Sequence, residues 1–275
     1  MCGEKLRRPG FQEAGITSHE PLAEDLFRLV FATDGWSGTE PDAGQFLMLH
    51  VSGGSDPLLA RPFGISAFRR EGRGAVLEII YRVVGRGTRL MAAWKAGQRL
   101  RFLGPLGRGF ALPPEGSRSL LVAGGIGLPP LLALAGRMEA MGRAGELTLL
   151  YGESRRERLA DLQSGIFPDI EVRTCTEDGS CGTRGMVTDL LKAAGSGEDR
   201  HLYVCGPNAM MGAVLGLSGG RGLSAQYSLE ARMACGFGVC SGCAVKVTSG
   251  GYVRACREGP VFDEAELTME SFARI

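Results

Sequence analysis

Short apolar stretches alternate with turn-forming residues along the first part of the chain. The clearest strand signals lie at residues 26–31, 44–51 and 76–84, and residues 17–33 are predicted to form a strand pair. A helical turn is expected from Leu90 to Trp94. Because these strands are short and the turn signals are frequent, residues 13–110 are predicted to form a small closed antiparallel β-barrel.

A different pattern begins after residue 117, where continuous apolar runs alternate with helical stretches. Such runs are expected of strands that are buried on both faces of a parallel sheet. The predicted strands are at residues 119–123, 147–152, 170–176 and 201–205, and the predicted helices end at Met141 and cover residues 187–194. This alternation predicts a doubly wound α/β domain, which binds its ligands at the carboxyl ends of the strands.

The chain is therefore expected to be a multidomain α+β protein with three modules. They are a β-barrel in residues 1–112, an α/β nucleotide-binding domain in residues 113–222 and a small C-terminal domain in residues 223–275, which includes a strand at residues 243–247. A length of 275 residues suits two domains and a small third.

Composition and charge narrow the possible partners. Hydrophobic residues make up 44% and charged residues 22% of the chain, as in ordinary globular proteins. A net charge of +1 argues against a nucleic-acid partner. No apolar run approaches the roughly 18 residues that a membrane span needs, and the charged N-terminus lacks the apolar core of a signal peptide. A cytoplasmic protein without a membrane partner is expected.

The third module carries four cysteines with a distinctive spacing. Cys235, Cys240 and Cys243 form a C-x4-C-x2-C pattern, and Cys256 follows in a separate segment, as in plant-type [2Fe–2S] proteins. The glycines between these cysteines permit a tight loop whose N–H groups approach the sulfurs. Structural zinc is an alternative, but zinc usually takes two close cysteine pairs and only one is present. A disulfide framework is less favoured, because the chain is long enough to bury a core without cross-links.

Two motifs in the predicted barrel suit an anionic cofactor. The segment Arg61-Pro62-Phe63-Gly64-Ile65-Ser66 combines a guanidinium, which matches phosphate geometry, with a proline that stiffens the strand end. In the segment Tyr81-Arg82-Val83-Val84-Gly85-Arg86-Gly87-Thr88 a strand ends in a glycine turn before a helix start, which is a favourable place for an anion. Each motif is weak alone, and their joint occurrence in one barrel is more specific.

The α/β module has its own glycine-rich turns. The first strand ends in Gly124-Gly125-Ile126-Gly127-Leu128-Pro129-Pro130, which places N–H groups at a helix start. The fourth strand ends in Cys205-Gly206-Pro207. Arg155 and Arg156 follow the second strand and could bind the 2′-phosphate of NADP, but they are better explained as a solvated helix start, which favours NADH.

Together these motifs make the chain similar to the ferredoxin–NADP reductase superfamily, in which an R-P-x-S-type strand and a G-x-G-T-type turn hold FAD. The residues that this resemblance assigns to FAD are Arg61, Pro62, Phe63, Gly64, Ile80, Tyr81, Arg82, Gly87 and Thr88. Those that it assigns to NADH are Gly124, Gly125, Gly127, Cys205, Gly206 and Pro207. One departure is Gly64, which stands where the motif commonly has serine, so that a hydroxyl to the flavin is either lost or supplied by Ser66.

The last segment narrows the resemblance. The pattern S-L-E-x-R-M-A-C-G-x-G-x-C-x-G-C, followed by C-x-x-G-P-V-F, resembles the electron-transfer subunits of NAD-linked, two-subunit dihydroorotate dehydrogenases. This resemblance implies a role in pyrimidine (UMP) biosynthesis and a catalytic partner subunit that carries FMN, in a heterotetramer of two plus two. It also implies that the chain has no dihydroorotate site and no catalytic acid–base residues of its own.

Two other functions fit parts of the sequence. A flavin and iron–sulfur reductase for another acceptor, such as a hydrogenase or an oxygenase, would share the cluster motif. A zinc-binding structural or regulatory module would require the nucleotide motifs to be degenerate. The two flavin and iron–sulfur functions, for dihydroorotate or for another acceptor, predict a coloured protein, whereas a zinc protein is colourless.

Overall fold

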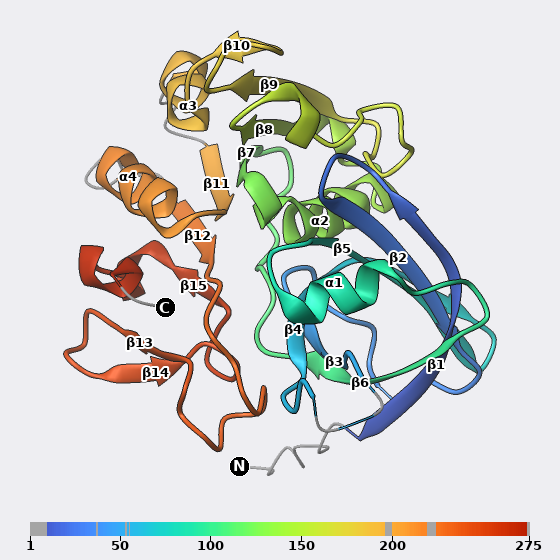
Figure 1. The fold of residues 1–275 in the computed structure, drawn as a ribbon. Helices are drawn as coiled ribbons and strands as arrows, with labels where there is room; N and C mark the ends of the chain where they lie inside the picture. Colours follow the sequence, from blue (N-terminus) through green and yellow to red (C-terminus); the bar gives the residue numbers. More distant parts are fainter. Residues whose placement is uncertain are drawn as a thin grey trace.

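The computed structural model describes residues 10–36, 38–52, 54, 56–195, 200–218 and 224–273. A β-barrel lies beside a sheet flanked by helices, and the C-terminal segment lies next to both (Figure 1). No helix in these ranges is long and apolar enough to cross a membrane.

The barrel confirms the predicted closed antiparallel fold. Its strands pair in the order β1-β2-β5-β4-β3-β6, and β6 closes the barrel on β1. The strands are β1 (Phe11–Pro21), β2 (Leu26–Thr33), β3 (Phe46–His50), β4 (Arg61–Glu71), β5 (Gly74–Arg82) and β6 (Arg99–Leu106). Alternate side chains, such as Leu29, Phe31, Leu77 and Ile79, are fully buried in the barrel core, as the period of two requires.

Two local predictions in the barrel need adjustment. The expected strand pair is real, but its first strand begins earlier, at Phe11. The expected helical turn belongs to α1 (Arg86–Ala92), which begins before Leu90 because the hydroxyl of Thr88 caps the preceding turn. The helix start is thus placed inside the sequence motif that the resemblance assigns to FAD.

The second part is a seven-stranded sheet with the order β10-β9-β8-β7-β11-β12-β15. All neighbouring strands are parallel except β15, which runs antiparallel to β12. The strands are β7 (Arg118–Gly124), β8 (Leu147–Glu153), β9 (Glu171–Thr176), β10 (Thr183–Arg184), β11 (Arg200–Cys205), β12 (Ser224–Ser228) and β15 (Val261–Asp263). From β7 the sheet first grows on one side through β8, β9 and β10, and then on the other side through β11, β12 and β15. The strand order therefore reverses between β7 and β11.

Helices cover both faces of this sheet. On β7, Leu121 and Ala123 pack in the apolar cluster that holds α2 (Leu128–Ala140), while Val122 packs in the one that holds α3 (Val187–Ala194) and α4 (Asn208–Ser218). This two-sided burial explains the continuous apolar run in the sequence. Helix α4 was not predicted, because its two glycines obscure the helical pattern.

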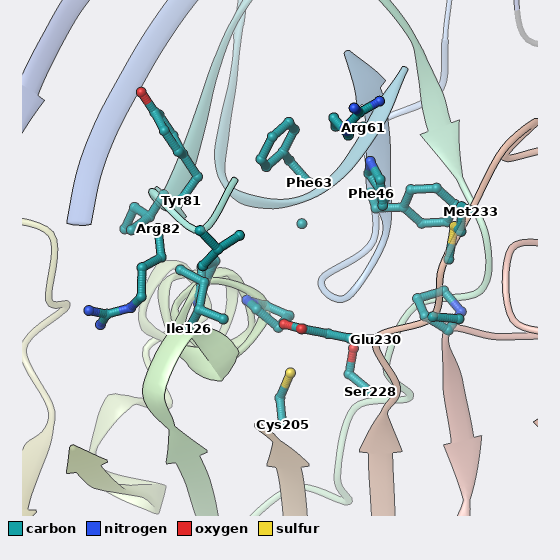
Figure 2. A pocket seen from close by; sticks show the side chains of 18 of the residues that line it. Phe46, Arg61, Phe63, Tyr81, Arg82, Ile126, Cys205, Ser228, Glu230 and Met233 are labelled. Atoms are coloured by element: carbon teal, nitrogen blue, oxygen red, sulfur yellow. The ribbon is translucent and has the colours of Figure 1, made fainter. Parts of the chain in front are cut away.

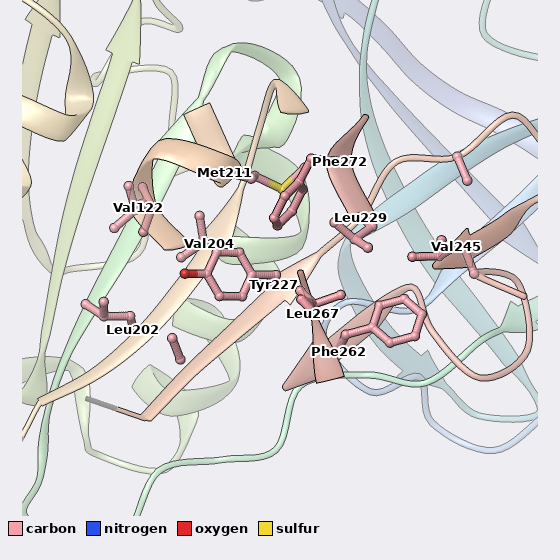
Figure 3. Packing of buried hydrophobic residues seen from close by; sticks show 14 of the residues in the cluster. Val122, Leu202, Val204, Met211, Tyr227, Leu229, Val245, Phe262, Leu267 and Phe272 are labelled. Atoms are coloured by element: carbon pink, nitrogen blue, oxygen red, sulfur yellow. The ribbon is translucent and has the colours of Figure 1, made fainter. Parts of the chain in front are cut away.

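The C-terminal segment is built into the rest of the molecule. Strand β12 pairs with β11 inside the large sheet, and β15 forms the edge beside it. Strand β13 (Ala244–Lys246) pairs with β14 (Tyr252–Arg254) in a separate hairpin. One apolar cluster joins Val204 of the sheet, Phe262 of β15 and Val245 of the hairpin (Figure 3). The same cluster includes Phe46 and Met48 of the barrel, so all three parts share buried packing.

Candidate functional site

A cavity of about 470 Å³ lies between the barrel and the carboxyl ends of β11 and β12. All nine residues that the resemblance assigns to FAD line it, together with Cys205 (Figure 2). Further lining residues that the sequence analysis did not assign are Gly44, Phe46, Val84, Gly85, Arg86, Ile126, Pro129, Pro130, Ser228, Leu229, Glu230, Ala231, Met233 and Pro260. Its size and its largely apolar walls with a few charged groups are typical of a cofactor site.

Arg61 and the turn before α1 meet at one side of this cavity. A Cβ atom at Gly87 would lie 3.2 Å from Nε of Arg61, so the glycine lets the arginine lie close against the turn. The hydroxyl of Thr88 accepts hydrogen bonds from the N–H groups of Val84 and Gly85 at 3.0 and 3.1 Å. Thr88 therefore holds the turn in shape, and the guanidinium of Arg61 is the charged group there that suits a phosphate.

Tyr81 supports the cavity from behind. Its ring points away from the cavity in Figure 2, stacks with Phe27 and His19, and shares a 2.9 Å hydrogen bond between its hydroxyl and Nε2 of His19. Burial raises the pKa of the Tyr81 hydroxyl, so it stays neutral. The aromatic ring that enters the cavity wall from the first motif is that of Phe63, which packs edge-on against Tyr81.

Arg82 connects the barrel to the large sheet. Its guanidinium is 4% exposed and forms ion pairs with Asp25, in the turn between β1 and β2, and with Glu153 at the end of β8. It also donates to the carbonyl of Arg158 at 3.2 Å. Its Nε has no partner among the described residues, although it is buried, and such a free N–H fits a ligand with acceptor atoms in the cavity.

Ser66 does not replace the hydroxyl that is absent at Gly64. The Ser66 hydroxyl donates to Oε1 of Glu78 at 2.9 Å, and Glu78 in turn pairs with Arg28 on the outside of the barrel. A Cβ atom at Gly64 would meet only Pro130, at 3.6 Å, which is an ordinary contact. The glycine therefore leaves the cavity wall without a side-chain hydroxyl at this position.

The glycine turns after β7 and β11 lie against each other at the point where the strand order reverses. A Cβ atom at Gly127 would lie 2.1 Å from the carbonyl oxygen of Cys205, and Gly206 has a φ of +157°. These glycines are needed first for the packing of one loop on the other. Such a switch point, outside the carboxyl ends of the strands, is where open α/β sheets bind their ligands.

A second cavity of about 350 Å³ opens at this switch point. Its lining includes Gly124, Gly125 and Pro207, which the resemblance assigns to NADH, whereas Gly127 is buried against the loop at Cys205 and Gly206. Other lining residues are Arg82, Ile126, Gly152, Glu153, Ser154, Arg158, Glu177, Gly185, Met186, Val187 and Met210. Arg82 and Ile126 line both cavities, so the two spaces adjoin.

Three polar groups face the first cavity from the side opposite Phe63, namely Cys205, Ser228 and Glu230 (Figure 2). Burial raises the pKa of the Cys205 thiol, which stays protonated. Glu230 is accessible through the open cavity, yet the surrounding walls keep it poorly hydrated, and this desolvation raises its pKa. The sequence analysis did not assign Ser228 or Glu230 to a site. The signal that could have found them is a further parallel strand, β12, whose sequence was interpreted only as the approach to the cysteine motif.

The segment that carries the first three cysteines, residues 235–243, is called the cysteine loop here, and it has the backbone expected of a sulfur-binding loop. Gly236 and Gly238 have φ angles of +78° and +88°, and Ser241, at +55°, is a non-glycine in the same region. Burial alone would raise the pKa of the Cys235 thiol. The backbone N–H groups of Cys240, Phe237 and Val239 outweigh this effect and lower the pKa to about 6. These N–H groups therefore favour a thiolate, which is the form that binds iron.

The four cysteines act on one another as two pairs. Cys240 helps to lower the pKa of Cys235, whereas Cys243 adds to the rise that burial causes in the pKa of Cys256. Within the ranges that the structure describes, no three cysteine, histidine or carboxylate side chains gather tightly enough to hold one metal ion. Two adjacent pairs fit a binuclear [2Fe–2S] cluster with four cysteine ligands.

The cysteine loop is anchored to the barrel on one side and open to solvent on the other. A Cβ atom at Gly236 would lie 2.4 Å from Cγ of Met48, so the loop packs directly on β3. Nη1 of Arg254 donates to the carbonyl of Gly238 at 2.8 Å. On the open side, Phe237 and Val239 are 47% and 75% exposed.

Comparison with known proteins identifies two domains of this chain and its fold. Residues 230–268 match the family described as the iron–sulfur cluster binding domain of dihydroorotate dehydrogenase B, and residues 121–215 match the oxidoreductase NAD-binding domain. The fold is similar to that in a solved structure of an NADH-dependent reduced ferredoxin–NADP oxidoreductase, with a TM-score of 0.80 and 24% identity. The match covers 99% of this chain and 93% of that chain.

Two curated relatives carry the same name. The chain is 37% identical to the "Dihydroorotate dehydrogenase B (NAD(+)), electron transfer subunit" of Caldanaerobacter subterraneus subsp. tengcongensis, over 93% of this chain and 97% of that protein. It is 39% identical to the subunit of this name from Desulforamulus reducens, over 82% of this chain and 87% of that protein.

Fold and sites together define an NAD-linked oxidoreductase subunit that uses FAD and a [2Fe–2S] cluster. The reductase barrel, the nucleotide-binding sheet and the cysteine loop each supply one part of this class. The chain belongs to the family of the electron transfer subunits of dihydroorotate dehydrogenase B.

Proposed function

We propose that this chain carries electrons between NAD(H) and a catalytic subunit that interconverts dihydroorotate and orotate in pyrimidine (UMP) biosynthesis. The partner would hold its own FMN, and two copies of each subunit would form a heterotetramer. The observation that carries the proposal is the continuity of the first cavity with the cysteine loop: Ala231 and Met233 line the cavity, and Cys235 is two residues beyond Met233.

The residues around the first cavity fit FAD. Arg61 supplies a cation for phosphate, and Phe46, Phe63 and Pro130 supply apolar walls for a flat ring. The free Nε–H of Arg82 supplies a donor. FAD held there would supply two-electron exchange with NADH and one-electron exchange with the cluster.

The second cavity fits the adenosine half of NAD(H). It lies at the carboxyl ends of β7, β8 and β9 and adjoins the first cavity at Arg82 and Ile126. A dinucleotide that spans both would place its nicotinamide end in the first cavity, beside Cys205 and Glu230. The protein then contributes position and exclusion of water.

The open side of the cysteine loop is the proposed contact face for the catalytic subunit. Cys240 is exposed there, between Phe237 and Val239 on one side and Gly242 on the other. Exposed apolar side chains beside a redox centre suit a protein partner, because docking excludes water and shortens the distance that electrons cross.

The test uses the full chain loaded with FAD and cluster. Alone it should oxidise NADH with artificial dyes and should show no turnover of dihydroorotate. Mixing it with a dihydroorotate dehydrogenase catalytic subunit should couple dihydroorotate oxidation to NAD⁺ reduction. If the isolated chain oxidises dihydroorotate, or if the mixture does not couple while dye reduction is normal, the proposed partner is wrong.

The contact face has its own variant. Val239→Glu adds a charge to an exposed apolar position and should lower coupling by about tenfold or more, since burying an unpaired charge costs several kcal/mol. Dye reduction and iron content should stay normal. The matched control is Met141→Glu, a similar change at an exposed site at the end of α2, which should leave coupling intact. Equal coupling in the two variants would place the partner elsewhere.

A further inference from the structure

The second cavity contains charged side chains that can distinguish the two nicotinamide dinucleotides. NADPH differs from NADH by a phosphate on the 2′-position of the adenosine ribose, which adds between one and two negative charges. The charged residues that line this cavity are Arg82, Glu153, Arg158 and Glu177. Their pairing decides which charge a ribose or a phosphate would meet.

In dinucleotide-binding sheets an acidic residue beyond the first glycine turn commonly binds the ribose hydroxyls. By position that residue is Glu153, which ends β8 beside β7. Its carboxylate is 5% exposed, is paired with Arg82 and lies 3.7 Å from Nε of Arg158. Glu153 is therefore used to join the barrel to the sheet, and two arginines neutralise it.

The arginines are equally engaged. Arg82 also pairs with Asp25, and Nη2 of Arg158 lies 3.3 Å from the carboxylate of Asp25. These two arginines and two carboxylates form a closed group of four charges with no net charge. Arg158 thus offers no uncompensated cation for a 2′-phosphate.

Glu177 is the remaining charge. It follows β9, and its N–H donates to the carbonyl of Glu153 at 3.1 Å, which places the two residues side by side at the cavity wall. The side chain of Glu177 is exposed and forms no salt bridge within the described residues. The cavity therefore presents one uncompensated carboxylate to its ligand.

The arginines that the sequence offered as phosphate ligands do not line the cavity. Arg155 pairs with Glu24 of the barrel side and lies 3.6 Å from Glu157. Arg156 begins a short 3₁₀ turn whose first N–H donates to Ser180. Neither arginine compensates Glu177 where a ligand would enter.

We propose that Glu177 selects NADH over NADPH, by accepting hydrogen bonds from the adenosine ribose hydroxyls and by repelling a 2′-phosphate. The inference rests on the proposed function, because it assumes that the second cavity takes the adenosine half of the dinucleotide. It moves the usual role of the acid after the second strand to the acid after the third. The reason is that Glu153 is committed to Arg82 and Arg158.

The test compares binding of ADP-ribose and 2′-phospho-ADP-ribose to the full chain loaded with FAD and cluster, by titration calorimetry. These probes carry the adenosine half only, so the readout does not depend on electron transfer. The wild-type chain should prefer ADP-ribose. In Glu177→Gln the ratio of the two dissociation constants should shift toward the phosphorylated probe by about tenfold, and in Glu177→Arg by about a hundredfold.

Steady-state dye reduction gives a second readout. In Glu177→Arg the KM for NADPH should fall strongly and the KM for NADH should rise, because the ribose hydroxyls lose their acceptor and a 2′-phosphate gains a cation. The matched control is Glu171→Gln, which removes the same charge from an exposed side chain at the opposite end of β9. This control should leave the ratio of the two dissociation constants and the KM for each dinucleotide unchanged.

The possible failures are distinguishable. If the wild-type chain binds ADP-ribose and oxidises NADH, but both Glu177 variants keep the wild-type preference, Glu177 does not select the dinucleotide and only this inference falls. If the wild-type chain binds neither probe and oxidises neither dinucleotide, the NAD-linked function falls with it.

Discussion

Loss of the Arg82 guanidinium should weaken the junction between the barrel and the large sheet. In Arg82→Met the carboxylate of Glu153, which is 5% exposed, would lose its closest cation. Breaking a buried pair on one side costs about 3–5 kcal/mol, because the remaining charge is left without compensation. At about 2–4 °C for each kcal/mol in a chain of this size, Tm should fall by roughly 10 °C.

The pH dependence of this loss follows from the state of Glu153. Burial raises the pKa of Glu153, and Arg82 and Arg158 oppose that rise. Without Arg82 the folded-state pKa rises further above the unfolded value. A carboxyl whose pKa is raised on folding is best tolerated below its unfolded pKa, and its contribution to stability is lost as the pH rises through its folded pKa. The Tm deficit of Arg82→Met should therefore be smaller at pH 5 than at pH 8.

The assay is thermal unfolding followed by circular dichroism with FAD in excess, so that cofactor loss does not enter the comparison. The control is Arg99→Met, which breaks an exposed pair with Glu13 and should change stability by less than about 1 kcal/mol. The double variant Arg82→Met/Glu153→Gln should be more stable than Arg82→Met. A deficit no larger than that of Arg99→Met, or one that grows toward acid, would refute this reasoning.

Two further substitutions test the cofactor sites. Arg61→Ala should weaken FAD binding by about 1.5–3 kcal/mol through loss of a charge-assisted phosphate contact, and an unchanged FAD dissociation constant would place the flavin elsewhere. Gly127→Ala should lower the free energy of unfolding by about 3 kcal/mol and weaken ADP-ribose binding, because its Cβ would lie 2.1 Å from the Cys205 carbonyl oxygen. The control is Gly136→Ala in α2, where a Cβ would meet nothing within 4 Å, so that this change should be neutral or stabilising. Equal urea midpoints in these two variants would contradict the packing of the glycine loops.

The sequence was most informative where local chemistry fixes local structure. Continuous apolar runs predicted β7, β8 and β11, because a strand buried on both faces has no polar side. The cysteine spacing predicted the cysteine loop for a similar reason, since three ligands from one short segment need a glycine-rich backbone. In both cases the determining residues are close together in the chain.

The remainder depends on contacts between distant residues. Nothing local shows that Arg82 reaches Glu153 or that β12 joins the large sheet, so Glu230 was read only as part of the cysteine motif. Likewise, the sequence offered Ser66 as a substitute for the serine absent at Gly64, but its hydrogen bond to Glu78 on the neighbouring strand β5 became visible only in three dimensions.

The central claim is that electrons pass between NAD(H) and the catalytic subunit through the cluster. The most direct measurement is dihydroorotate-dependent NAD⁺ reduction by the mixed subunits, with wild-type chain or with Cys240→Ser, alongside iron, labile sulfide and FAD contents. Oxygen is a poor replacement for a thiolate at iron–sulfur sites, so the variant should lose the cluster, keep FAD and keep NADH-dependent dye reduction. Coupling should fall by about a hundredfold or more, because the one-electron carrier between the two subunits is gone. Coupling at the wild-type rate in a variant that contains no iron or sulfide would contradict it.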